Sequence, residues 1–222
     1  MTATKGRRYL LIFDCDGVLV DSETTSNRVL AAAISGVGLP MSAEQVAESF
    51  EGMRLADIQL GVEAKLGRKL PAGWLADFEA DRAAAFKRDL TPISGIDGVL
   101  EEAVAAGIPM CVASQARRKK TALTLGLTGL SRFFPEGVLF SSTMVEHGKP
   151  HPGLFLLAAE TMGFNPTDCV VVEDGVLGVE AGRAAGMRVL GYAPAGCDPD
   201  RLSKRGAEVF RSMVDLPALL DF

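Results

Sequence analysis

The sequence lacks the cysteine pattern of a disulfide framework or of a structural zinc site. Its four cysteines, Cys15, Cys111, Cys169 and Cys197, are widely separated and form no C-x-x-C pair. Three of them lie in or beside apolar runs, where cysteine usually packs as a small hydrophobic residue. We therefore expect free thiols in a reducing compartment, most simply the cytoplasm.

The chain also lacks an excess of basic residues and a long hydrophobic run. Its formal net charge is -5, so no domain-wide positive surface is expected to hold a nucleic acid backbone. The first apolar run, Tyr9–Phe13, ends at an aspartate and is too short for a signal peptide or a membrane span. We expect neither a nucleic acid partner nor a membrane segment. With 48% hydrophobic residues over 222 positions, the chain is expected to fold as one large domain or as a core carrying a smaller domain.

Short apolar runs alternate with helix-like segments along most of the chain. Continuous apolar runs of this length are typical of strands buried on both faces of a parallel sheet. The runs are Tyr9–Phe13, Pro109–Ala113, Cys169–Val172 and Arg188–Tyr192. The helix-like segments are Val99–Ala106, Ala116–Leu125, Leu154–Met162 and Val176–Ala185. This alternation predicts an α/β fold, with a Rossmann-like parallel sheet as its core.

The stretch from about residue 21 to residue 90 contains no buried-strand pattern. Its helical segments are expected at Thr24–Ser35, Ala43–Phe50, Leu55–Leu66 and Gly73–Arg88, with Gly and Pro breaks between them. A helical block inserted after the first strand predicts a cap domain over residues 19–91. Residues 1–18 and 92–222 then form the core domain, and the hinges lie near residues 18–20 and 90–95.

Polar residues stand directly after several of the predicted strands. They are Asp14 and Asp16 after the first, Ser114 and Gln115 after the second, and Glu173 and Asp174 after a later one. Ligands of open α/β sheets bind outside the carboxyl ends of the strands, and adjacent strands are only about 4.8 Å apart. We therefore expect these side chains to converge on one small molecule. Lys149, in a Gly-Lys-Pro loop, is expected to reach the same rim.

Three acids in one site would require a positive counter-charge. Asp14, Glu173 and Asp174 would repel one another unless they were neutralised or protonated. Oxygen ligands of this kind are those that Mg²⁺ prefers, and Mg²⁺ commonly bridges to a substrate phosphate. The sequence therefore predicts a Mg²⁺ cofactor, with Lys149 supplying the remaining positive charge.

The same residues are suited to phosphoryl transfer. Asp14 is the predicted nucleophile, which forms an aspartyl-phosphate. Asp16 is expected to point the same way, with a pKa raised by the neighbouring carboxylate, so that it protonates the leaving oxygen and then activates water. The Ser114 hydroxyl and Lys149 are expected to hold the non-bridging oxygens, and Gln115 is a further substrate-binding candidate.

Four motifs together resemble the haloacid dehalogenase-like hydrolase superfamily, in the branch whose helical cap follows the first strand. They read FDCDGVLVDSE (Phe13–Glu23), VASQ (Val112–Gln115), GKPHPGLF (Gly148–Phe155) and VVVEDGVLGVEAGRAAGM (Val170–Met187). They stand in the family's order and span nearly the whole chain. The site residues that the resemblance implies are Asp14 as nucleophile and metal ligand, Asp16 as acid/base and backbone-carbonyl ligand, Ser114 and Lys149 as phosphate-binding groups, and Glu173 and Asp174 as metal ligands.

Within this superfamily the chain is most similar to β-phosphoglucomutase-like proteins and sugar-phosphate phosphatases. That resemblance implies a small phosphorylated metabolite as substrate, namely a sugar, sugar-acid or polyol phosphate. The mutase carries a histidine in the cap shortly after the first motif, whereas Ser26 and Asn27 stand in that region here. We therefore favour a phosphatase over a mutase. A non-catalytic phosphate-binding module would require a lost nucleophile or acid, and none is lost.

Other features leave alternatives open. The glycines Gly178, Gly182 and Gly186 lack the G-x-G-x-x-G spacing of a dinucleotide site, and their spacing favours close packing of a helix on the sheet.

The basic run at residues 117–120 is either a solvated helix face or a source of positive potential at the rim. Cap cations that could contact a second anionic group are Arg54, Lys65, Arg82 and Lys87. We expect a monomer or a weak homo-oligomer.

Overall fold

A six-stranded, fully parallel sheet forms the centre of the larger part of the molecule. The computed structural model describes residues 9–50 and 52–221. In sheet order the strands are β5 (Leu139–Ser141), β4 (Met110–Ser114), β1 (Leu10–Phe13), β6 (Cys169–Glu173), β7 (Arg188–Tyr192) and β8 (Glu208–Phe210). Every neighbouring pair in this sheet is parallel. The predicted α/β, Rossmann-like fold is therefore confirmed.

Alternate residues of β1 face two different hydrophobic clusters, one on each side of the sheet. Leu11 and Phe13 pack on one side, and Leu10 and Ile12 on the other, and all four are fully buried. The helices that contribute to the first cluster are α5 (Ile96–Ala105), α6 (Arg118–Leu127) and α10 (Leu216–Leu220). Those that contribute to the second are α7 (Gly153–Met162), α8 (Val176–Ala184) and α9 (Asp200–Ser203). Burial on both faces explains why the strand is apolar at every position.

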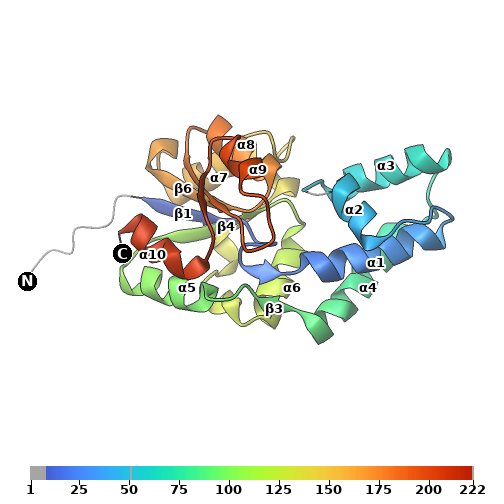
Figure 1. Ribbon diagram of the computed structural model, residues 1–222, viewed down its shortest axis with the longest axis horizontal. Helices are drawn as coiled ribbons and strands as arrows, with labels where there is room; N and C mark the ends of the chain where they lie inside the picture. Colours follow the sequence, from blue (N-terminus) through green and yellow to red (C-terminus); the bar gives the residue numbers. More distant parts are fainter. Residues whose placement is uncertain (1–8, 51, 222) are drawn as a thin grey trace, which may run out of the picture.

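Four helices inserted after β1 form a separate block, which lies to the right in Figure 1. They are α1 (Glu23–Gly36), α2 (Ala43–Phe50), α3 (Leu55–Leu66) and α4 (Trp74–Asp89). Their apolar faces form a third cluster, in which the Trp74 and Phe78 rings stack with their centroids 6.2 Å apart. The chain enters and leaves the block through the antiparallel pair β2 (Val20–Asp21) and β3 (Thr91–Pro92). The division into core and cap domains at residues 18 and 92 stays a prediction.

The sequence patterns located the long elements and missed the short ones. Helix α6 begins at Arg118 rather than at Ala116, because the Ala116 N–H donates to Ser114 Oγ and Arg117 is extended. Strands β5 and β8 have three residues each, too few to produce an apolar run. The remaining short elements are the 3₁₀ helices Leu130–Arg132, Glu136–Val138, Ser142–Met144, Pro166–Asp168 and Met213–Asp215. Within the described ranges no helix has the length and apolar character needed to span a bilayer.

Candidate active site

A cavity of about 910 Å³ opens at the carboxyl ends of β1, β4 and β6, beneath the helical block. Its wall on the sheet side contains all seven predicted site residues, namely Asp14, Asp16, Ser114, Gln115, Lys149, Glu173 and Asp174. Its other wall comes from α1, α2, α3, α4 and the loop that precedes α3. The structure therefore brings together residues that are up to 160 positions apart in the sequence.

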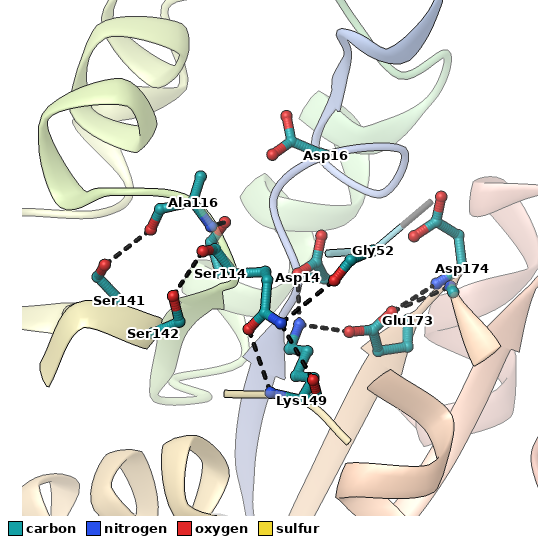
Figure 2. A network of polar contacts seen from close by, with 12 residues as sticks. Asp14, Asp16, Gly52, Ser114, Ala116, Ser141, Ser142, Lys149, Glu173 and Asp174 are labelled. Atoms are coloured by element: carbon teal, nitrogen blue, oxygen red, sulfur yellow. Dashed lines mark hydrogen bonds and ion pairs between the residues drawn. The ribbon is translucent and has the colours of Figure 1, made fainter. Parts of the chain in front are cut away.

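Lys149 lies between two acids at the bottom of this cavity (Figure 2). Its Nζ donates to Asp14 Oδ1 at 2.5 Å and also to Glu173 Oε1. All three side chains are at least 90% buried, and the ammonium lies 5.0 Å from the centroid of the Phe155 ring. Burial lowers the pKa of Lys149, but Asp14 and Glu173 raise it by more, so that it lies above its ordinary value. Lys149 is therefore held as a fixed positive charge beside Asp14.

Both carboxylate oxygens of Glu173 accept hydrogen bonds from within the protein. Oε1 accepts from Lys149, and Oε2 accepts from the backbone N–H groups of Asp174 and Gly175, each at 3.1 Å. A Cβ atom on Gly178 would lie only 1.8 Å from Glu173 Oε1, so glycine at that position leaves room for the carboxylate. These contacts orient Lys149 and the turn after β6. Direct metal ligation by Glu173 stays a prediction.

Asp16 does not face Asp14 in the way that the sequence predicted. The chain bends at Cys15, and Figure 2 shows the Asp16 carboxylate apart from the cluster at Asp14. Asp16 Oδ1 accepts hydrogen bonds from Lys120 Nζ and Ser22 Oγ. Burial raises the pKa of Asp16, but Lys120 and Ser22 lower it by more, and the result lies below the ordinary value of 3.8. The expectation of a raised pKa is wrong because Lys120 and Ser22 outweigh the effect of burial on Asp16, and the pKa that the neighbouring carboxylate raises is that of Asp14.

Lys120 belongs to the site, whereas the sequence interpretation considered it only as part of the basic run at residues 117–120. It is 8% exposed, and its ammonium lies 5.4 Å from the centroid of the Phe86 ring of α4. The buried residues of α6 are Lys120, Thr121, Thr124 and Leu125. This spacing is that of one face of a helix, and it places Lys120 on the face that packs against the protein. The same helical periodicity can be read from the sequence and could have identified Lys120 as an inward-facing cation.

Gln115 joins three segments at the rim of the cavity. Its amide nitrogen donates to the carbonyls of Lys149 and Gly52, and its amide oxygen accepts from the Lys149 N–H at 3.1 Å. Ser142 Oγ donates to the Gln115 carbonyl at 2.6 Å. Gln115 therefore fixes the Lys149 loop and connects it to the segment before α3. The predicted contact between Gln115 and substrate stays a prediction. Ser114, buried at the end of β4, accepts from the Ala116 N–H and still has a proton to donate.

Asp14 and Asp174 both have raised pKa values, so Lys149 does not fully compensate the burial and mutual repulsion of the acids in the site. Burial raises the pKa of Asp14 to about 7, with Lys149 lowering it and Glu173 and Asp16 adding to the rise. Burial, together with Glu23, Glu173 and Asp14, raises the pKa of Asp174 well above its ordinary value. A Cβ atom on Gly17, where φ is +78°, would lie 1.8 Å from Asp174 Oδ2. The loop after Asp14 and the Asp174 carboxylate therefore meet closely.

This arrangement fits a bound Mg²⁺ in its donor chemistry. Over the described parts of the chain, no three acidic, histidine or cysteine side chains gather into a complete metal site. Mg²⁺ usually needs only one or two carboxylates, because waters and substrate phosphate complete its octahedron. Asp14 and Asp174 are the two carboxylates whose pKa values are raised, chiefly by burial and further by neighbouring acids. A cation held by them would favour their charged forms and lower both pKa values.

Comparison with known proteins shows the family to which the chain belongs. Residues 10–186 match the family model for haloacid dehalogenase-like hydrolases. The 6-phosphogluconate phosphatase of Escherichia coli K12 is 34% identical over 180 residues, which cover 81% of this chain and 80% of that protein. Hexitol phosphatase A of the same organism is 33% identical over 204 residues, covering 87% and 86%. A HAD family hydrolase of Deinococcus radiodurans R1, solved with bound phosphate and sodium, has 32% identity and a TM-score of 0.76 over 97% of this chain and 96% of that one. The chain belongs to the haloacid dehalogenase-like hydrolase family.

Proposed function

We propose that this protein is a phosphatase that hydrolyses small phosphate monoesters, with Asp14 as its nucleophile. The observation that carries the proposal is the buried Asp14 carboxylate, bound by Lys149 on one oxygen and lying in the same cavity as Ser114 and Asp174. Relatives that act on 6-phosphogluconate and hexitol phosphates support a sugar, sugar-acid or polyol phosphate as substrate.

In the first step, Asp14 attacks the phosphorus atom through the oxygen that Lys149 does not bind. The bond between phosphorus and the leaving oxygen breaks, its electron pair stays on that oxygen, and Asp16 supplies the proton. In the second step, water attacks the phosphoaspartate while Asp16 accepts its proton. Inorganic phosphate leaves and Asp14 is regenerated. With Lys120 and Ser22 bound to it, Asp16 has a lowered pKa and is ionised, so it has no proton to donate. Before the first step, Asp16 must therefore take up a proton from solvent as it exchanges its contact with Lys120 for one with the leaving oxygen.

The non-bridging oxygens need positive charge and hydrogen-bond donors throughout. Lys149 supplies a fixed ammonium, because Asp14 and Glu173 hold it on two sides. The Ser114 hydroxyl donates to a second oxygen from the end of β4. A Mg²⁺ held by the Asp14 and Asp174 carboxylates, and by the Asp16 carbonyl that the family resemblance implies, would offset the charge of the phosphoryl group.

The test is a panel of phosphate esters incubated with the purified protein and Mg²⁺, with release of inorganic phosphate as the readout. Hydrolysis of sugar, sugar-acid or polyol phosphates by the wild type, and its loss in Asp14→Asn with an unchanged circular dichroism spectrum, is the expected result. Accumulation of an isomeric ester in place of free phosphate would indicate a mutase. No turnover of any ester would overturn the proposal.

A further inference from the structure

The cavity contains several cations, and most of those described have a partner within the protein. Lys149 and Lys120 bind the acids at the ends of the strands. Arg117 pairs with Glu79 at 3.1 Å, and Arg54 donates to the carbonyls of Ser142 and Glu146 at 2.9 and 3.0 Å. These four side chains all contact protein acceptors that hold the walls of the cavity together, although the buried Nε of Arg54 has no hydrogen-bond partner among the described residues.

Arg82 of α4 differs from these four. It lines the cavity, is half-buried, and places its guanidinium 4.7 Å from the centroid of the Phe78 ring. In the described part of the chain no carboxylate or carbonyl accepts a hydrogen bond from it or lies within ion-pair distance. Burial lowers the pKa of Arg82, and Asp16 and Glu79 offset this only in part. A guanidinium with several donors therefore faces the cavity without an acceptor, an arrangement that favours binding of an anion.

The position of Arg82 indicates which part of a substrate it would meet. Lys149, Ser114 and Asp14 lie on the sheet side, where the phosphoryl group is transferred. Arg82 comes from the helical block and is close enough to Asp16 for each to affect the pKa of the other. Since Asp16 is the proposed proton donor to the leaving oxygen, Arg82 lies on the leaving-group side. The acids near it do not exclude an anion, because Lys120 pairs with Asp16 and Arg117 pairs with Glu79.

We propose that Arg82 is a specificity-determining residue, which binds a second anionic group on the leaving-group part of the substrate. The planar guanidinium suits a carboxylate or a second phosphate, either of which it can contact with two parallel hydrogen bonds. The enzyme then prefers sugar-acid phosphates or sugar bisphosphates to neutral polyol phosphates. This inference rests on the proposed phosphatase function.

The experiment compares kcat/KM for an aldonic acid phosphate, a hexitol monophosphate of the same carbon number, and a sugar bisphosphate. The wild type is expected to prefer one anionic substrate to the hexitol phosphate by at least about 10-fold, and Arg82→Gln is expected to reduce that ratio by about 10- to 100-fold, the range for hydrogen bonds to charged groups. Most of the loss should be in KM, because Arg82 contacts a part of the substrate that does not react. Arg82→Lys, which keeps the charge without the planar fork, should fall between the two.

Lys87→Gln is the matched control, since it removes a cation from the same helix at an exposed position outside the cavity. Its substrate ratio should equal that of the wild type. Three results would overturn the role of Arg82: equal rates on the hexitol and both anionic substrates, an unchanged ratio in Arg82→Gln and Arg82→Lys, or an equal fall in Lys87→Gln. In each of these cases the phosphatase proposal stands. Absence of turnover on these three esters, with hydrolysis of other esters in the panel, overturns the role of Arg82 alone, and absence of turnover on every ester overturns both. A preference for the aldonic acid phosphate would identify the second anionic group as a carboxylate, and a preference for the sugar bisphosphate would identify it as a phosphate.

Discussion

Replacement of Gly178 by alanine should lower both activity and stability, although alanine is normally the better helix residue. In an α-helix interior, Gly→Ala is expected to stabilise by up to about 1 kcal/mol. At Gly178 in α8, however, the added Cβ would lie 1.8 Å from Glu173 Oε1 and 2.0 Å from its Cδ. The Glu173 carboxylate must therefore move by more than 1 Å, judged against a normal van der Waals contact of roughly 3.5 Å. That movement breaks the contact between Glu173 and Lys149 and the two backbone hydrogen bonds of Glu173.

The magnitude follows from the groups that lose a partner. Hydrogen bonds to a charged group each contribute about 1.5–3 kcal/mol, so the loss exceeds the gain in helix propensity. Three such contacts are lost, so we expect a net destabilisation of about 3.5–8 kcal/mol, or roughly 7–30 °C in Tm for a protein of this size. A misplacement of about 1 Å at Lys149 should also lower kcat/KM by roughly 100-fold.

The assays are urea unfolding and phosphate release. Gly98→Ala is the matched control, because Gly98 is also helical and a Cβ there would meet no atom within 4 Å. Gly98→Ala should keep wild-type activity and gain up to about 1 kcal/mol. If Gly178→Ala behaved in the same way, the role assigned to Glu173 would be refuted.

Three further predictions concern the other charged groups. Lys120→Met removes the cation that holds the pKa of Asp16 below 3.8. The part of the pH profile of kcat/KM that reports the titration of Asp16 should therefore move to higher pH. An unchanged pH profile would contradict the pairing of Lys120 with Asp16. Hydrogen bonds from Lys69, first, and then from Gln59 lower the pKa of Glu63 to about 2 from 4.5. The stability advantage of the wild type over Glu63→Gln should therefore be full above pH 4.5 and disappear as the pH falls to about 2, and equal urea midpoints at neutral pH would rule it out. Mg²⁺ at about 100 times its Kd should stabilise the wild type by about 2.7 kcal/mol, or roughly 5–10 °C in Tm. Asp174→Asn should lose most of that increase in Tm. An equal increase in both proteins would show that Asp174 is not a metal ligand.

The positions of the site residues were predictable because strand ends of a parallel sheet converge. Asp14, Ser114 and Glu173 stand at the ends of strands that neighbour one another, and apolar runs mark where each strand ends. Lys149 lies outside any strand, and it was located by its motif alone. What the motifs could not give is which cation contacts which acid.

Contacts between elements depend on helix orientation, which a single sequence specifies weakly. The pairing of Lys120 with Asp16 requires α6 to present one particular face to the loop after β1. The glycine spacing in α8 shows the same limit. Gly182 packs closely on β7, where a Cβ would lie 2.7 Å from Val189, as the spacing predicted. Gly178 instead makes room for an acid, and Gly186 occupies a turn at φ +76° with no neighbour within 4 Å.

The most direct test of the account is chemical quenching during turnover, followed by mass spectrometry of the peptide that contains Asp14. With a hydrolysed phosphate ester and Mg²⁺, we expect one phosphoryl group on Asp14, at higher occupancy in Asp16→Asn because dephosphorylation needs that acid. The adduct should be absent from Asp14→Asn. Full phosphate release by Asp14→Asn, or a phosphoryl group on another residue of the wild type, would contradict the nucleophile assignment.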